Sequence, residues 1–176
     1  MVGGLDTMYG RRWRDEKFRD QVNQLRGAQT DAYPVTMTIV EGNGHTGLPD
    51  RDLIKDMYAA VRNPVPRELT WLMTDDVIKD FFWLHTDSPG KQREIDATCR
   101  DNHLTVTTTN VVSATVLLDS RLVDFQKPVT VEVNGKATTR TIKPSLRTLC
   151  ETMQRRCDPG LAFTTELPLP LGESKP

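Results

Sequence analysis

A histidine and an aspartate each follow a glycine-rich turn near the start of the chain, and residues of these two types can carry out acid–base chemistry together. His45 ends a Gly-Asn-Gly-His motif, and Asp6 comes just after a Gly-Gly pair. A carboxylate bonded to one imidazole nitrogen fixes the tautomer and stabilises the imidazolium, which leaves the other nitrogen to accept a proton from a nucleophile. The competing interpretation is that His45 lies in water on a flexible loop.

The elements between the two turns determine whether these side chains can meet. Charged residues are dense from 11 to 27, with an apolar stripe at helical spacing, which predicts an amphipathic helix ending at Gly27. The stripe consists of Phe18, Val22 and Leu25. Apolar residues then alternate from 35 to 40, which predicts a strand. Turns that follow successive parallel strands lie side by side, so we expect Asp6 and His45 to be close.

A second helix is predicted after the His45 turn, because a Pro-Asp pair at residues 49–50 supplies a helix start. Its buried stripe is expected to be Leu53, Ile54, Met57 and Val61. The Asn-Pro-Val-Pro segment at residues 63–66 breaks regular structure, because the residue before each proline is pushed away from helical angles. We therefore expect a boundary between a part of residues 1–63 and a part of residues 64–176.

The second part has the pattern of successive strands. They are predicted at residues 68–73, 77–84, 94–99, 104–109, 115–123, 129–133 and 137–142, with a last one at 162–167. Asn134-Gly135 predicts a tight hairpin turn, because both residues tolerate positive φ. Ser145 predicts the cap of one helix within this part. The predicted fold class is therefore α+β, with a helix-strand-helix segment followed by a β-sandwich-like module with one helix.

Composition excludes several classes of function. The 176 residues carry a net charge of −1, which predicts an ordinary globular protein without a nucleic-acid partner. The longest apolar runs are a few residues, so no membrane partner is expected. Three cysteines without metal-ligand spacing indicate neither a zinc site nor a full set of disulfides, and no cofactor is predicted. The opening residues lack a secretory pattern, and localisation and oligomeric state stay unknown.

The remaining chemically capable residues have simpler explanations. His85 and His103 fall near predicted strand ends without a second ligand nearby in sequence, so we interpret both as ordinary histidines. Four aromatic residues could form a ligand platform, but on the strands of a small sandwich they are more often part of the core. These residues are Trp71, Phe81, Phe82 and Trp83.

The Asp6 turn, the helix, the strand and the Gly-x-Gly-His turn resemble the end of an α/β-hydrolase fold, in which the acid precedes the histidine along the chain. The segments RDLIKDMYAAVRNPVPRELTW, FFWL and SRLVDFQKPVTVEVNGK resemble the C-terminal region of prolyl-oligopeptidase-like or esterase-like serine hydrolases that carry an extra β-module. The resemblance covers nearly the whole chain. It implies that residues 1–63 are the end of a catalytic domain, with Asp6 as the triad acid and His45 as the base.

The chain departs from this family in one essential respect. A nucleophile elbow reads Gly-x-Ser-x-Gly, and none of the five serines lies in such a motif. The interpretation is therefore a C-terminal fragment, or a remnant, of a serine hydrolase that cleaves ester or peptide bonds, inactive alone. Its substrate, a small-molecule ester or peptide, would bind the complete parent, and Ile39, Ile54 and Met57 should be exposed where neighbouring parts are missing. The alternative is a non-catalytic β-sandwich interaction module, in which His45 is incidental.

Overall fold

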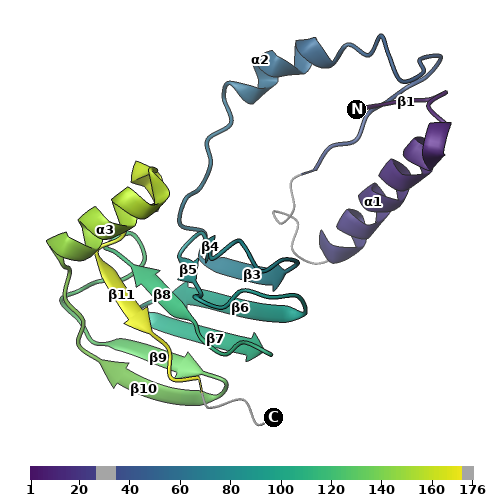
Figure 1. The fold of residues 1–176 in the computed structure, drawn as a ribbon. Coiled ribbons are helices and arrows are strands. Elements are labelled where there is room, and N and C mark those ends of the chain that lie inside the picture. The colour runs from purple at the N-terminus through teal and green to yellow at the C-terminus, as the bar shows by residue number, and fades with distance from the viewer. Residues whose placement is uncertain (27–34, 172–176) are drawn as a thin grey trace. The chain divides into compact units, whose positions relative to one another are not determined.

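The computed structural model describes residues 1–26 and 35–171, and the chain divides into two compact units, Met1–Val61 and Arg62–Pro176 (Figure 1). The observed division lies two residues before the boundary expected from the Asn-Pro-Val-Pro segment, after residue 61 and not after residue 63. The class is α+β, as predicted: three α-helices accompany strands that are arranged in three separate sheets in the described part of the chain.

The first unit contains a small parallel sheet joined by a helical crossover. In chain order its elements are β1 (Val2–Gly3), a 3₁₀ turn (Met8–Gly10), α1 (Arg11–Arg26), β2 (Ile39–Val40), a second 3₁₀ turn (Asp50–Asp52) and α2 (Leu53–Met57). Strands β1 and β2 run parallel, with Val2 opposite Ile39 and Gly3 opposite Val40. The predicted order of helix, strand, turn and helix is therefore present, preceded by a short strand at the N-terminus.

Three predictions for this unit differ from the structure. The strand predicted from residue 35 forms only at Ile39–Val40, because the two residues of β1 are its sole pairing partner among the described residues. In the apolar stripe predicted for residues 11–27, Val22 is buried but Phe18 is 55% exposed. The Leu25 side chain and the predicted helix end at Gly27 lie outside the described residues.

The apolar stripe of the helix that follows the His45 turn, which was expected to be buried, is exposed. Helix α2 ends at Met57, which is 69% exposed, Ile54 is 48% exposed, and Val61 beyond the helix is 92% exposed. A five-residue helix has little intrinsic stability and needs a surface to pack on. The exposure of Ile54 and Met57 does match the expectation that this region lacks covering elements, and Ile39 is half-buried.

The second unit contains two antiparallel-rich sheets. One sheet has the strand order β10-β9-β7-β6-β3, and the other has the order β11-β8-β5-β4 (Figure 1). All strands in these sheets pair antiparallel except β7 with β9. The strands are β3 (Glu68–Met73), β4 (Asp80–Phe81), β5 (Leu84–His85), β6 (Arg93–Arg100), β7 (His103–Thr109), β8 (Thr115–Leu118), β9 (Val129–Val133), β10 (Lys136–Arg140) and β11 (Thr165–Pro168).

Apolar residues from both of these sheets form one core. Strand β3 alternates exposed and buried residues along its six positions, as expected for a strand with one face in a core. Trp83, Leu117 and Phe163 are fully buried in the same cluster as Ile95 and Val131. The interpretation of the aromatic residues as core is confirmed, because Trp71 is also buried and both Phe81 and Phe82 pack against the cluster.

The prediction of one strand over residues 77–84 is wrong, because the chain turns twice in this segment. Asp75 Oδ1 accepts hydrogen bonds from the backbone N–H groups of Val77 and Ile78, both at 2.8 Å, which holds a turn in place of extended backbone. Phe82 then has φ of 50°, and a tight hairpin joins β4 to β5. Strand β8 likewise ends early, since the Asp119 carboxylate accepts from Arg121 N–H and starts a turn.

Helix α3 (Leu146–Arg156) begins at the predicted cap. Ser145 has extended backbone angles, and its hydroxyl accepts a hydrogen bond from Thr148 N–H at 3.3 Å. Cys157 ends the helix in the left-handed conformation, with φ of 52°. Buried Thr152 joins the helix to the segment that follows it. Its hydroxyl oxygen accepts from Phe163 N–H and lies within donating distance of the Phe163 carbonyl, both at 3.0 Å.

Gly135→Ala is expected to destabilise the second unit by about 1–2 kcal/mol, because the turn between β9 and β10 needs positive φ. Asn134 has φ of 48° and Gly135 has φ of 79°, as predicted for this pair. A Cβ at Gly135 would meet nothing within 4 Å, so the effect would come from the backbone alone. Urea unfolding should show the loss, and exposed Lys136→Ala in the same hairpin should stay within about 0.5 kcal/mol of wild type.

Candidate active site

The structure brings Asp6 and His45 together. His45 Nδ1 lies 3.1 Å from Asp6 Oδ2, although 39 residues separate them in sequence. The backbone holds the two turns against each other, because Leu5 N–H donates to the carbonyl of Asn43 at 2.9 Å and Gly4 N–H donates to the carbonyl of Val40 at 2.9 Å. The contact expected from the parallel crossover is therefore present, and it joins the ends of β1 and β2.

Glycines make this close approach of the two turns possible. A Cβ on Gly3 would lie 2.0 Å from the Gly44 carbonyl oxygen, and a Cβ on Gly4 would lie 2.4 Å from Glu41 Oε2. Real atoms do not approach so closely, so a side chain at Gly3 would force the backbones apart. The Gly-Gly pair before Asp6 therefore has a packing role in addition to making the turn.

Gly3→Ala is expected to separate the two turns and break the Asp6–His45 contact. The free energy of unfolding should fall by about 1–3 kcal/mol, which is typical of overpacking. The ¹⁵N and ¹H chemical shifts of the His45 imidazole should then match those of an Asp6→Asn variant. Gly44→Ala is the matched control, because a Cβ there meets nothing within 4 Å. Unchanged His45 shifts in Gly3→Ala would contradict the assigned role of this glycine.

Asp6 is a buried carboxylate with a defined setting, whereas His45 is open to solvent. Asp6 is 6% exposed, and the His45 side chain is 65% exposed. Arg11 Nη1 lies 3.6 Å from Asp6 Oδ1, which makes an ion pair without a hydrogen bond in the described part of the chain. The first turn of α1 also holds the Asp6 backbone, since Arg12 N–H donates to the Asp6 backbone carbonyl at 3.1 Å.

Arg12 fastens the Asp6 turn to the first turn of α1. Its Nη1 donates to the Gly4 carbonyl at 2.6 Å, and its Nε donates to Glu16 Oε1 at 3.0 Å. The hydrogen bond to Glu16 raises the pKa of the Arg12 guanidinium, so this cation stays charged. The backbone that carries Asp6 is therefore held on two sides, by β2 and by the helix.

The arrangement can orient an imidazole for proton transfer. An ionised carboxylate only accepts hydrogen bonds, so Nδ1 carries the proton that faces Asp6. Nε2 of neutral His45 is then an acceptor, and no hydrogen bond from the described residues reaches it. A solvent-facing Nε2 with Nδ1 fixed by a carboxylate is the arrangement that a general base needs.

The first unit does not contain a nucleophile of the expected kind. Residues 1–61 include no serine and no cysteine, and the four described serines, Ser88, Ser113, Ser120 and Ser145, belong to the second unit. No group of three or more His, Cys, Asp or Glu side chains in the described ranges could hold a metal ion. Asp6 and His45 are therefore a carboxylate–imidazole pair in a unit that has no serine or cysteine.

Sequence reasoning missed a second histidine with carboxylate partners. Asp80 and His85 face each other across the β4–β5 hairpin, and the wrong prediction of one continuous strand over residues 77–84 concealed this pairing. A prediction of the hairpin itself would have placed these side chains opposite each other. The Asp80-x₄-His85 spacing was the available sequence feature.

Comparison of the chain with protein-family models, with curated proteins and with solved structures returned no match. None of the helices in the described segments has both the length and the apolar character that crossing a membrane requires.

Proposed function

We propose that this chain is the C-terminal part of a serine hydrolase that cleaves ester or peptide bonds through an acyl-enzyme. The observation that carries the proposal is the contact of 3.1 Å between His45 Nδ1 and Asp6 Oδ2. His45 is the general base and then the general acid, and Asp6 orients it. The substrate is a small-molecule ester or a peptide.

In the proposed mechanism the serine hydroxyl, supplied by a part of the enzyme outside these residues, lies next to His45 Nε2. As the oxygen attacks the carbonyl carbon, Nε2 takes its proton, and the imidazolium is stabilised by Asp6. Nε2 returns that proton to the leaving group. Water then repeats the sequence on the acyl-enzyme, with His45 again accepting and donating one proton.

Three features of the first unit support this proposal. The acid precedes the histidine along the chain, as in the α/β-hydrolase order. A parallel crossover through α1 joins the two strands whose ends carry them. Among the described residues, the parallel sheet also has only two strands, without the neighbouring strands and helices that such sheets need, and Ile54 and Met57 are exposed. In this proposal the second unit is the appended β-sandwich-like module, because its two sheets share one core.

The coding DNA upstream of Met1 tests the proposal. We expect an open reading frame that continues in frame with Met1 and encodes a Gly-x-Ser-x-Gly segment. Protein made from that longer frame should hydrolyse a simple aryl ester. An in-frame stop codon next to a translation start at Met1 would contradict the proposal.

The alternative is a non-catalytic β-sandwich interaction module with an N-terminal docking segment. Two observations favour it: residues 1–61 contain no serine or cysteine, and the second unit has a core of its own. The same DNA test separates the two functions, since the module needs no upstream coding sequence. An intact chain of 176 residues in native extracts would support the module.

A further inference from the structure

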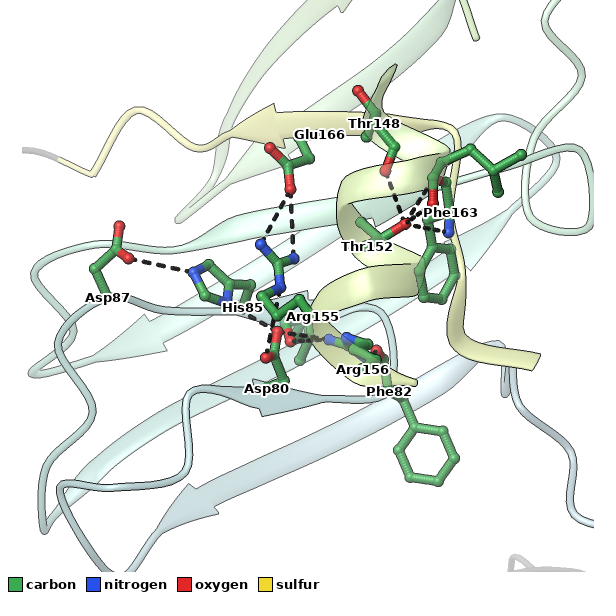
Figure 2. A network of polar contacts seen from close by, with 12 residues as sticks. Asp80, Phe82, His85, Asp87, Thr148, Thr152, Arg155, Arg156, Phe163 and Glu166 are labelled. Atoms are coloured by element: carbon green, nitrogen blue, oxygen red, sulfur yellow. Dashed lines mark hydrogen bonds and ion pairs between the residues drawn. The ribbon is translucent and has the colours of Figure 1, made fainter. Parts of the chain in front are cut away.

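His85 lies between two carboxylates in the second unit, in a network that has no part in the proposed hydrolase chemistry. Its Nδ1 is 2.8 Å from Asp80 Oδ1, and its Nε2 is 3.3 Å from Asp87 Oδ1 (Figure 2). The His85 side chain is only 12% exposed, whereas that of Asp87 is 80% exposed. The imidazole therefore bridges an inner carboxylate and an outer one.

This geometry selects the doubly protonated ring. Ionised carboxylates only accept hydrogen bonds, a neutral imidazole has one N–H, and an imidazolium has two. With neutral His85 either Asp80 or Asp87 would face a nitrogen lone pair. Both hydrogen bonds therefore exist together only when His85 is protonated.

The inner carboxylate also anchors helix α3. Arg156 Nη2 donates to Asp80 Oδ1 at 2.7 Å, and Arg155 Nε lies 3.7 Å from Asp80 Oδ2. Arg156 also donates to the carbonyls of Phe82 and Leu84, and its side chain is 5% exposed. The last turn of α3 is thereby joined to the β4–β5 hairpin through Asp80 (Figure 2).

The charged groups linked to His85 lie on β4, after β5, on β11 and on α3, whereas β8, whose Thr115 pairs with His85, carries none. The three carboxylates are Asp80 on β4, Asp87 after β5 and Glu166 on β11, which pairs with Arg155 at 3.3 Å. The two other cations are Arg155 and Arg156 on α3. Among these five groups there are three negative and two positive charges, and protonated His85 adds a third positive charge.

The electrostatic environment favours that state. The hydrogen bond to Asp80 raises the pKa of His85 above its usual value, against the opposing effects of burial and of Arg155. Burial alone would raise the pKa of Asp80, but its contacts with His85 and Arg156 outweigh burial and lower that pKa to about 2. Asp80 thus remains ionised wherever His85 titrates.

We propose that His85 is a pH-dependent latch that, while protonated, joins the Asp87 turn to Asp80 of the β4–β5 hairpin, the carboxylate that also binds the last turn of α3. Loss of the proton removes one of its two hydrogen bonds and releases the exposed Asp87 side first. Since the pKa of His85 is raised in the folded state, the stabilisation is fully present below the unfolded pKa of about 6.5 and is lost as pH rises through the folded pKa.

Two measurements on the full chain test the latch. NMR titration should give His85 a pKa above 6.5, and Asp87→Asn should lower it by about 0.5 units, as expected for the loss of one partly exposed ion pair. Amide exchange should report the opening directly, because Thr86 N–H donates to the Lys79 carbonyl at 2.9 Å and closes the hairpin. Its protection factor, corrected for intrinsic rates, should fall about threefold between pH 6 and pH 9, the factor that corresponds to about 0.5 pKa units.

His85→Gln should remove this pH dependence of Thr86 protection. His103→Gln is the matched control, because His103 also pairs with a carboxylate, Glu132 at 3.4 Å, but on the other sheet, and the dependence should persist. Asp87→Asn keeps the test valid if His85→Gln fails to fold, since Asp87 is exposed. A His85 pKa at or below 6.5, or a Thr86 protection factor that does not change between pH 6 and pH 9, would overturn the proposal.

Discussion

His45→Ala is expected to lower kcat/KM for an aryl ester by about four to six orders of magnitude in the protein made from the longer reading frame. The physical reason is that Nε2 of His45 is the proposed acceptor of the serine proton, and alanine offers no base in its place. Asp6→Asn should lower kcat/KM by about 10⁴, because an amide facing Nδ1 favours the wrong tautomer. Steady-state hydrolysis of the ester measures both.

The control for this prediction is His103→Ala, which removes a half-exposed histidine of the second unit. Its kcat/KM should remain within twofold of wild type, on the order of a surface substitution. Circular dichroism must show that the His45 and Asp6 variants are folded. Activity within about tenfold of wild type in His45→Ala would remove His45 from the chemistry, since removal of a triad base costs far more.

Trp83→Ala is expected to destabilise the second unit by about 3–5 kcal/mol, which is a large part of the stability of a typical domain. Trp83 is fully buried in the core shared by the two sheets, and its Nε1 donates to the Pro66 carbonyl at 2.7 Å. The substitution leaves a cavity and removes this hydrogen bond together. Urea unfolding followed by far-UV circular dichroism measures the loss.

A series of variants separates the two contributions of Trp83. Trp83→Phe retains most of the ring but leaves the Pro66 carbonyl without its donor, which should cost about 1–3 kcal/mol. Trp13→Ala is the control, because Trp13 lies in the first unit and is 61% exposed. This substitution should change the free energy of unfolding of the second unit by less than about 0.5 kcal/mol. A loss below about 1 kcal/mol for Trp83→Ala would mean that this ring is not central to the core.

Local sequence patterns predicted the elements that are determined by short-range chemistry. Asn134-Gly135 predicted the hairpin, because few residue types accept positive φ. Ser145 predicted the start of α3, because its hydroxyl caps the helix. The Asp6–His45 contact was predictable as well, because a helical crossover between parallel strands leaves few arrangements for the turns. The glycines around them then allow the close approach.

Features that depend on tertiary surroundings were not predictable in the same way. Met57 and Val61 have the spacing of a buried stripe, yet whether a stripe is buried depends on the surface available to it. The contact of His85 with Asp80 depends on the β4–β5 hairpin, whose turn places Phe82 at φ of 50°. Arg156 donates to Asp80, from which it is separated by 76 positions in sequence, and no local sequence pattern indicates such a contact.

The most direct test of the central claim is labelling with a serine-directed fluorophosphonate, followed by mass spectrometry of the labelled peptide. We expect label on the serine of a Gly-x-Ser-x-Gly segment in the longer protein, and loss of labelling in His45→Ala, because Nε2 of His45 activates that serine. The chain of 176 residues alone should remain unlabelled. Label on a serine that follows His45, or labelling that persists in His45→Ala, would contradict the account.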